Sequence, residues 1–211
     1  MRRPLAVAVM VALVAASSAS AQLTVGVKGA ANISSPQVTE NGAAPAIPYR
    51  SRTGVTVGAT AGLGVTPWLA IQLEGRYTQV GTRQVEAGVT GVLRVSYVEF
   101  PLVVRAAIPV RGSPLTPHLF AGGFVRFKTA CDIRFSGAVS LNLDCGTADV
   151  GDLRSTDHGV VFGGGADVRL GPGEVTLDVE YALGLRNVAL DPTAEVFSRV
   201  LVLNVGYRLA V

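Results

Sequence analysis

The stretch Val175-Thr-Leu-Asp-Val-Glu-Tyr-Ala-Leu-Gly-Leu185 decides the fold. Every second side chain in it is apolar, and the positions between are polar or small. A period of two is the signature of a β-strand with two unlike faces, because successive strand side chains point to opposite sides. We therefore expect a strand that separates an apolar environment from a polar one.

The same alternation recurs through the rest of the chain. Loops rich in Gly, Pro, Ser, Asn and Asp separate the alternating segments, and helical periodicity is hard to find anywhere. The sequence predicts an all-β fold, an eight-stranded antiparallel up-and-down β-barrel in which each strand pairs with the next in a meander. The expected strands cover about residues 23–28, 54–65, 68–79, 95–108, 118–128, 160–169, 175–185 and 201–209.

Alternation alone does not say which face of the barrel is inside. A soluble lipocalin-like carrier of a lipophilic ligand would place the apolar face inward, whereas a transmembrane barrel places it outward against lipid. Glycines crowd the polar face, where they leave room for long side chains inside a narrow barrel: Gly58, Gly62, Gly64, Gly122, Gly163, Gly165, Gly184 and Gly206. This favours the transmembrane arrangement.

The polar face also carries charges of both signs, and buried charges must be paired. We expect a polar network that fills the lumen and leaves little room for a pore. Its expected members are Lys28, Glu74, Arg76, Glu99, Arg105, Arg126, Asp167, Arg169, Asp178, Glu180 and Arg208.

Aromatic residues near strand ends suit the interfacial girdles of membrane barrels. Tyr77, Tyr181 and Tyr207 lie on apolar faces, and Trp68 lies at a turn. Strict alternation would put Trp68 on the polar face unless the turn reorients it. These four residues are the expected aromatic girdle.

Connections alternate in length, as they do in membrane barrels with short periplasmic turns and longer surface loops. An even strand number puts both termini at the short-turn end, which is expected to face the periplasm. The expected surface loops are 32–52, 81–91, 129–157 and 187–197.

The first 21 residues have the features of a secretory signal peptide. Arg2 and Arg3 precede an apolar stretch from Leu5 to Ala16, and Ala19-Ser20-Ala21 suits signal peptidase. The expected mature domain is 22–211, in the outer membrane. Its net charge falls from +3 to about +1 when the two arginines are removed, so nothing indicates a nucleic-acid partner.

Two cysteines, Cys131 and Cys145, lie in one irregular segment. An exported protein meets an oxidising compartment, so we expect a disulfide that staples a long loop. A metal or redox site would call for a CxxC motif or histidine companions, and this segment has neither.

Several motifs together resemble the PorT-like "outer membrane protein beta-barrel domain" family. They are Val25-Gly-Val-Lys-Gly-Ala-Ala-Asn-Ile-Ser34, Tyr97-Val-Glu-Phe-Pro-Leu-Val-Val-Arg105, Pro117-His-Leu-Phe-Ala-Gly-Gly123, Tyr181-Ala-Leu-Gly-Leu-Arg-Asn-Val188 and Val205-Gly-Tyr-Arg208. The resemblance covers the mature chain and implies a barrel of the small OmpA and OmpX type. It brings no shared catalytic residues. Such barrels often end in an aromatic residue read by the insertion machinery, whereas this chain ends in Val211.

Chemistry is sparse in this sequence. His118 is expected to join the lumen network, and His158 lies near Ser155 and Asp157 at the rim, where adjacent strand residues would point apart. Asp144, Asp149, Asp152 and Asp157 lack the spacing of a calcium loop and suit a solvated acidic loop.

We therefore expect no cofactor, no metal and no catalytic residues. The expected protein is a non-enzymatic scaffold whose partners are outer membrane lipid, the barrel insertion machinery and extracellular or envelope proteins bound through its loops. A lipid-modifying enzyme of the outer membrane is the second alternative, beside the soluble carrier.

Overall fold

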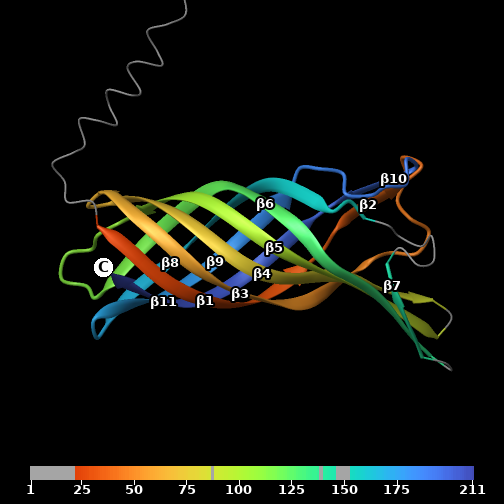
Figure 1. The fold of residues 1–211 in the computed structure, drawn as a ribbon, viewed down its shortest axis with the longest axis horizontal. Helices are drawn as coiled ribbons and strands as arrows, with labels where there is room; N and C mark the ends of the chain where they lie inside the picture. The colour runs from red at the N-terminus through yellow and green to blue at the C-terminus, as the bar shows by residue number, and fades with distance from the viewer. Residues whose placement is uncertain (1–21, 87, 138–139, 146–152) are drawn as a thin grey trace, which may run out of the picture.

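The computed structural model describes residues 22–86, 88–137, 140–145 and 153–211. The expected signal peptide, 1–21, lies outside this part. Figure 1 shows an elongated barrel of long tilted strands. The strands are β1 (Leu23–Ser34), β2 (Gln37–Glu40), β3 (Arg50–Thr66), β4 (Leu69–Glu86), β5 (Val89–Ala107), β6 (Leu115–Ser136), β7 (Leu141–Asp144), β8 (Thr156–Leu170), β9 (Gly173–Gly184), β10 (Ala194–Phe197) and β11 (Arg199–Ala210).

Eight of these strands form a closed antiparallel ring. Their order around the ring is β5-β4-β3-β1-β11-β9-β8-β6, and pairing of β5 with β6 completes it. The first and last strands, β1 and β11, pair along most of their length, from Thr24 opposite Ala210 to Ser34 opposite Val200. The predicted eight-stranded meander is confirmed.

The two ends of the barrel differ. The turn end carries the tight turns at 67–68 and 171–172, the connection 108–114 and the C-terminus (Figure 1). The loop end carries the connections 35–49, 137–155 and 185–198, with β2 and β10 paired as a small separate sheet and β7 added to the edge of β6. The fourth connection at this end, between β4 and β5, spans only residues 87–88.

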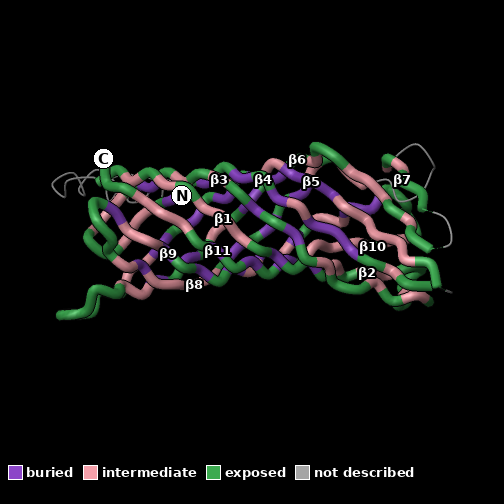
Figure 2. Tube along the Cα trace, turned by 90° about the horizontal axis from the view of Figure 1, so that it is seen from below, coloured by how far each residue is buried: buried purple, intermediate pink, exposed green. Residues whose placement is uncertain are grey.

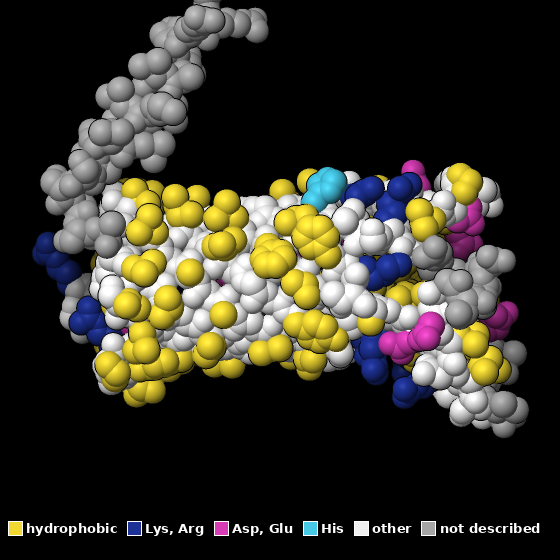
Figure 3. Space-filling model, viewed as in Figure 1, with side chains coloured by type: hydrophobic (Ala, Val, Ile, Leu, Met, Phe, Trp, Pro, Cys, Tyr) yellow, Lys and Arg dark blue, Asp and Glu magenta, His cyan; other side chains and the backbone are white. Residues whose placement is uncertain are grey.

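The apolar face of the barrel points outward. Val27 is 63% exposed and Leu119 is 61% exposed, whereas Glu99 and Arg126 on the opposite face are each 1% exposed. Figure 2 shows this alternation along the strands, and Figure 3 shows apolar side chains spread over the barrel wall from the turn end to its middle. The arrangement is that of a membrane barrel and the reverse of a soluble carrier.

One inward glycine shows why that face is rich in this residue. A Cβ on Gly163 would lie 2.6 Å from Cζ of Phe120 and 2.3 Å from the carbonyl oxygen of Val179. Phe120 lies opposite Gly163 in the β6–β8 register, so its ring fills the space that a side chain would need. Glycine here lets a large neighbour pack into the lumen.

The strands on one side of the loop end are longer than expected. β4 continues to Glu86, and β5 already begins at Val89, which lies opposite Glu86. The prediction of a loop over 81–91 was therefore wrong. Side chains on both faces of this hairpin are largely polar, and such strands beyond a membrane lose the alternation that reveals them in sequence. β6 likewise runs to Ser136.

The cysteines lie in this extension rather than in an irregular loop. Cys131 belongs to β6, Cys145 follows β7, and a disulfide joins them with Cα atoms 5.3 Å apart. The amide of Cys145 also donates a hydrogen bond to the carbonyl of Cys131 at 3.0 Å. The disulfide fastens the edge strand β7 to the barrel wall.

No helix in the described ranges has the length and hydropathy needed to cross a bilayer.

Candidate functional site

The middle of the lumen is filled by ion-paired side chains. Arg76 Nε donates to Glu99 at 2.9 Å, and its Nη1 donates to Glu180 at 3.0 Å. Arg126 lies 3.7 Å from the other carboxylate oxygen of Glu99 and donates through Nε to Asp157 at 3.0 Å. Each of these residues is buried. Five strands (β4, β5, β6, β8 and β9) meet through these contacts.

The chain of contacts continues toward the turn end. Glu74 lies 3.5 Å from Arg76 and accepts a hydrogen bond from Lys28 at 2.8 Å. Lys28 also lies 3.0 Å from Asp178, which is 2.8 Å from Nε2 of His118. The expected role of His118 as a lumen residue matches where it lies, since its side chain is buried among these groups.

The last links reach the turn end itself. Asp167 is paired with Arg105 and with Arg208, the latter at 2.8 Å. Arg208 also lies 2.7 Å from Glu174. A ring nitrogen of His118 lies 3.5 Å from Asp167 and joins this group to the links above. An unbroken series of ion pairs and hydrogen bonds thus runs along the barrel from Asp157 to Glu174.

One expected member lies elsewhere. The side chain of Arg169 is 86% exposed, and its nearest carboxylate, Glu174, is 4.0 Å away. Arg169 is one residue from the end of β8, where the strand leaves the barrel and alternation no longer fixes which side faces the lumen. The expectation that Arg169 belongs to the network was wrong.

Two carboxylates of the network were not among the expected members. Glu174 lies four residues before Asp178 on β9, and residues separated by an even number of positions share one face of a strand. The alternation of β9 therefore already places Glu174 on the lumen face. Asp157 directly precedes His158 at the start of β8, before a regular pattern is visible, and only the structure brings it to Arg126.

The network closes the lumen between two cavities. A cavity of about 780 Å³ opens at the turn end, and one of about 640 Å³ opens at the loop end. Between them, beside Lys28 and Phe120, a third measures about 10 Å³. An eight-stranded barrel has an interior just wide enough for its own side chains, and here the ion-paired side chains occupy its middle between the two larger cavities.

The loop-end cavity has apolar walls and a charged floor. Val80, Val95 and Val200 line it, and Tyr97 and Arg126 lie at its base. The guanidinium of Arg126 lies 4.4 Å from the centre of the Tyr97 ring, a cation–π contact. The three valines and Tyr97 are themselves buried, and a cavity with mostly apolar walls and a few polar groups is typical of binding sites.

Loop residues form the rim of this cavity. β2 and β10 pair above it, with Val38 opposite Val196. Burial raises the pKa of the Tyr49 hydroxyl, and the nearby charge of Glu40 raises it further. The pKa of Asp191 is lowered, because the hydroxyl and amide of Thr193 both donate hydrogen bonds to its carboxylate.

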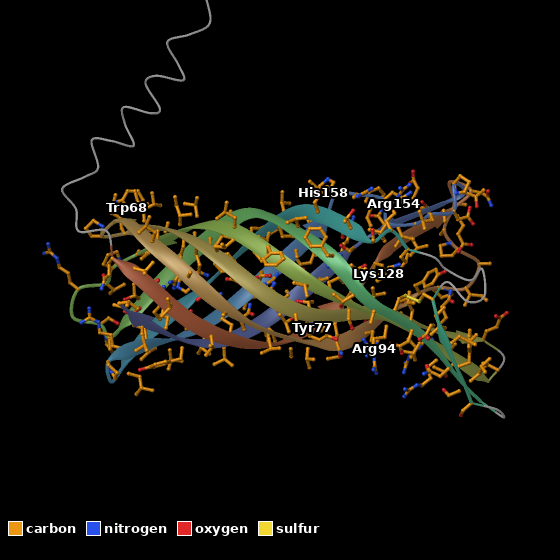
Figure 4. The ribbon with its side chains drawn as sticks, in the orientation of Figure 1. Trp68, Tyr77, Arg94, Lys128, Arg154 and His158 are labelled. Carbon is orange, nitrogen blue, oxygen red and sulfur yellow. A yellow bond between two sulfur atoms is a disulfide. The ribbon has the colours of Figure 1, made fainter. Side chains whose placement is uncertain are left out.

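The four expected girdle residues lie on the outer surface or at its edge. Trp68 is 53% exposed in the turn before β4 (Figure 4), so the turn removes it from the polar face. Tyr207 donates to the carbonyl of Leu170 at 3.0 Å, also at the turn end. Tyr77 lies farther toward the loop end, and Tyr181 packs against Phe162 with ring centres 5.8 Å apart.

The two histidines lie on opposite faces of the barrel wall, His118 inside the lumen and His158 outside. His158 lies opposite Val125 and points outward (Figure 4), whereas its neighbour Asp157 is fully buried against Arg126. Adjacent strand residues face apart, so the arrangement lacks a Ser-His-Asp geometry. The described residues contain no cluster of three or more His, Cys, Asp or Glu suited to a metal, and Asp149 and Asp152 lie outside them.

Comparisons with known proteins found similar solved structures and one matching family model. OprG, an outer membrane protein of Pseudomonas aeruginosa, is similar in structure with a TM-score of 0.53 and 12% identity, covering 90% of this chain and 97% of that chain. Neisserial surface protein A has a TM-score of 0.49 at 15% identity, with coverage of 90% and 97%. No curated protein matches the chain. A family model described as "Outer membrane protein beta-barrel domain" matches residues 15–190, well over half of the 211 residues, and the chain therefore belongs to that outer membrane family.

Proposed function

We propose that this outer membrane barrel is a non-enzymatic scaffold that binds an extracellular or envelope partner at its loop end. The observation that carries the proposal is the contrast within the lumen. Paired charges close its middle, while an apolar cavity of about 640 Å³ stands open at the loop end. A closed barrel with an open apolar pocket suits binding better than passage.

The proposal includes an orientation. The signal peptide 1–21 is removed, the turn end with both termini faces the periplasm, and the loop end faces the exterior. Short turns on the periplasmic side and longer outer loops are the usual arrangement of outer membrane barrels. Insertion machinery and membrane lipid are then the other partners of the chain.

Cysteine labelling tests the orientation. Thr193 and Gly112 are exposed at opposite ends, and the native cysteines are bonded to each other. Thr193→Cys and Gly112→Cys are treated with a membrane-impermeant maleimide on intact cells. We expect labelling of the first and protection of the second until the envelope is opened, and the reverse pattern would overturn the orientation.

A dye titration tests the cavity. The mature chain, folded in detergent, is titrated with N-phenyl-1-naphthylamine, which fluoresces in apolar sites. Leu190→Glu places a charge on an exposed apolar residue that lines the cavity, and we expect it to weaken saturable binding strongly. Leu141→Glu is the control, because Leu141 is an exposed apolar residue at the loop end outside the cavity. Equal dye affinity of the cavity variant and the control variant would contradict the proposed binding site.

Planar-bilayer recording tests the closed lumen. We expect the wild-type barrel to give no stable conductance steps, because the ion pairs fill its middle. Steady steps in the wild type would show a pore and contradict the scaffold proposal.

A further inference from the structure

A group of arginines lies on the outer surface where the apolar wall ends. We call it the arginine patch. It belongs to β3, β4, β5 and β6, and its members are Arg50, Arg52, Arg83, Arg94 and Arg134.

Strand register brings these side chains together. Arg50 lies directly opposite Arg83. Arg94 lies directly opposite Gly81. The side chain of Arg52 covers Gly81, because a Cβ atom on this glycine would lie 3.3 Å from Cδ of Arg52. The missing side chain of Gly81 thus gives Arg52 room beside Arg94.

The far side of the patch is formed by β6. Arg134 lies opposite Val92, two residues along β5 from Arg94. Asp132 lies opposite Arg94, and Asp144 of β7 lies opposite Asp132. Five guanidinium groups therefore share one outer face with two carboxylates.

The patch is poorly neutralised by the protein. Among the described residues, the ion pairs lie inside the barrel or at its turn end, and none of them includes a patch arginine. Nε of Arg94 is buried and has no hydrogen-bond partner in that part of the chain. Like charges directly opposite each other destabilise a sheet, and Arg50 and Arg83 occupy such positions. An anion between them would remove this cost.

The height of the patch suits a lipid headgroup. From Leu69 to Tyr77, β4 rises roughly 27 Å along its own axis, or about 21 Å along the barrel axis at a tilt of about 40°. This is close to the ~25 Å apolar band of outer membrane barrels. Gly81, opposite Arg94, lies four residues beyond Tyr77, about 10 Å farther along the axis.

The figures show the same order on one face. In Figure 4, Arg94 lies on the outer surface beyond Tyr77 in the direction of the loop end. In Figure 3, apolar side chains cover the wall up to this region, and basic side chains gather beyond them.

We propose that the arginine patch binds the phosphate groups of a lipid headgroup in the outer leaflet. Guanidinium groups bind phosphate in two-pronged geometry, and basic residues beside an anionic membrane surface attract its headgroups. The acyl chains of the same lipid would lie along the apolar wall below, beside Leu73 and Phe100, which are about half exposed. The inference rests on the proposed outward orientation of the loop end.

The test compares matched variants of the mature chain in detergent. Arg83→Gln/Arg134→Gln removes two exposed patch arginines, and Arg111→Gln/Arg169→Gln removes two exposed arginines at the turn end. Native mass spectrometry measures the affinity for bis-phosphorylated lipid A. We expect the patch variant to bind about twenty-five-fold more weakly, since each basic residue near a membrane surface contributes about a factor of five. The turn-end variant should bind like the wild type.

Two further ligands separate the sources of phosphate. Dephosphorylated lipid A should bind both variants and the wild type equally weakly, and millimolar inorganic phosphate should not displace bis-phosphorylated lipid A. Equal loss in both variants, undiminished binding by the patch variant, or full displacement by free phosphate would each overturn the proposal. Heat-dependent gel mobility shows that each variant is folded, and cysteine labelling at Thr193 tests the orientation separately.

Discussion

Arg76 donates hydrogen bonds to Glu180 across the full width of the barrel, at 3.0 and 2.6 Å. The two residues are 104 positions apart in sequence. Their strands, β4 and β9, stand four places apart in the ring of eight, which is as far apart as two strands can be. One ion pair therefore braces opposite walls of the barrel.

Removing this brace should destabilise the fold. Arg76→Met leaves Glu74, Glu99 and Glu180 buried around an apolar side chain, and uncompensated buried charges cost about 3–5 kcal/mol. We expect the free energy of unfolding to fall by about this amount, measured by urea titration of the barrel in detergent with gel mobility as the readout.

Arg169→Met is the matched control, because it removes the same charge from an exposed position. Its stability should stay within about 0.5 kcal/mol of the wild type. Equal stability of the two variants would show that the lumen pairs do not brace the barrel.

A larger side chain at position 163 should disturb packing inside the lumen. Gly163→Val would force its Cβ against the Phe120 ring and the backbone of β9, and overpacking of this kind costs about 1–3 kcal/mol. Urea titration should show the loss. The double variant Gly163→Val/Phe120→Ala should recover part of it, because truncation removes one of the two clashes. No recovery would mean that the backbone contact alone sets the cost.

Breaking the disulfide should loosen β7 and leave the barrel intact. Cys131→Ser/Cys145→Ser frees a strand of four residues that pairs only with the edge of β6 among the described strands. Limited trypsin digestion should then cut at Arg134 faster than in the oxidised wild type, while heat-dependent mobility stays the same. Unchanged digestion would show that the ladder of β6 and β7 holds without the disulfide.

Alkaline titration should reveal the environment of Tyr49. Burial raises the pKa of its hydroxyl above 10.0, so the neutral form is favoured in the folded loop. Its contribution to loop stability is full below the pKa of an unfolded tyrosine and is lost as pH rises through the folded value. The phenolate absorbance of the wild type minus that of Tyr49→Phe gives the midpoint. A midpoint at or below that of free tyrosine would contradict the half-buried position of Tyr49 beside Glu40.

The barrel could be predicted because membrane and lumen impose opposite demands on alternate residues. Val175 to Leu185 shows this plainly, and so do the inward glycines, which a soluble strand would avoid. Where β4 and β5 continue past the apolar wall, that constraint ends. The sequence pattern there predicts a loop, although Thr82, Arg83 and Gln84 pair regularly with β5.

Ten of the eleven residues expected in the network line the lumen, but the sequence could not assign partners. Period two fixes the face of a residue, whereas its partner depends on how far each strand is shifted along the barrel wall. Lys28 could therefore be placed inside, yet its contacts with Glu74 and Asp178 come from strands on either side of it. The arginine patch was missed because its members fall where alternation fails.

The seam between β1 and β11 gives the charged lumen a role in assembly. Lys28 of β1 must reach Asp178 on the far side of β11, and Arg208 of β11 neutralises Asp167 and Glu174. Until the first and last strands meet, Asp178 lacks the ammonium of Lys28. An open sheet in the bilayer would thus carry incompletely neutralised acids, and closure would be favoured by charge as well as by backbone pairing.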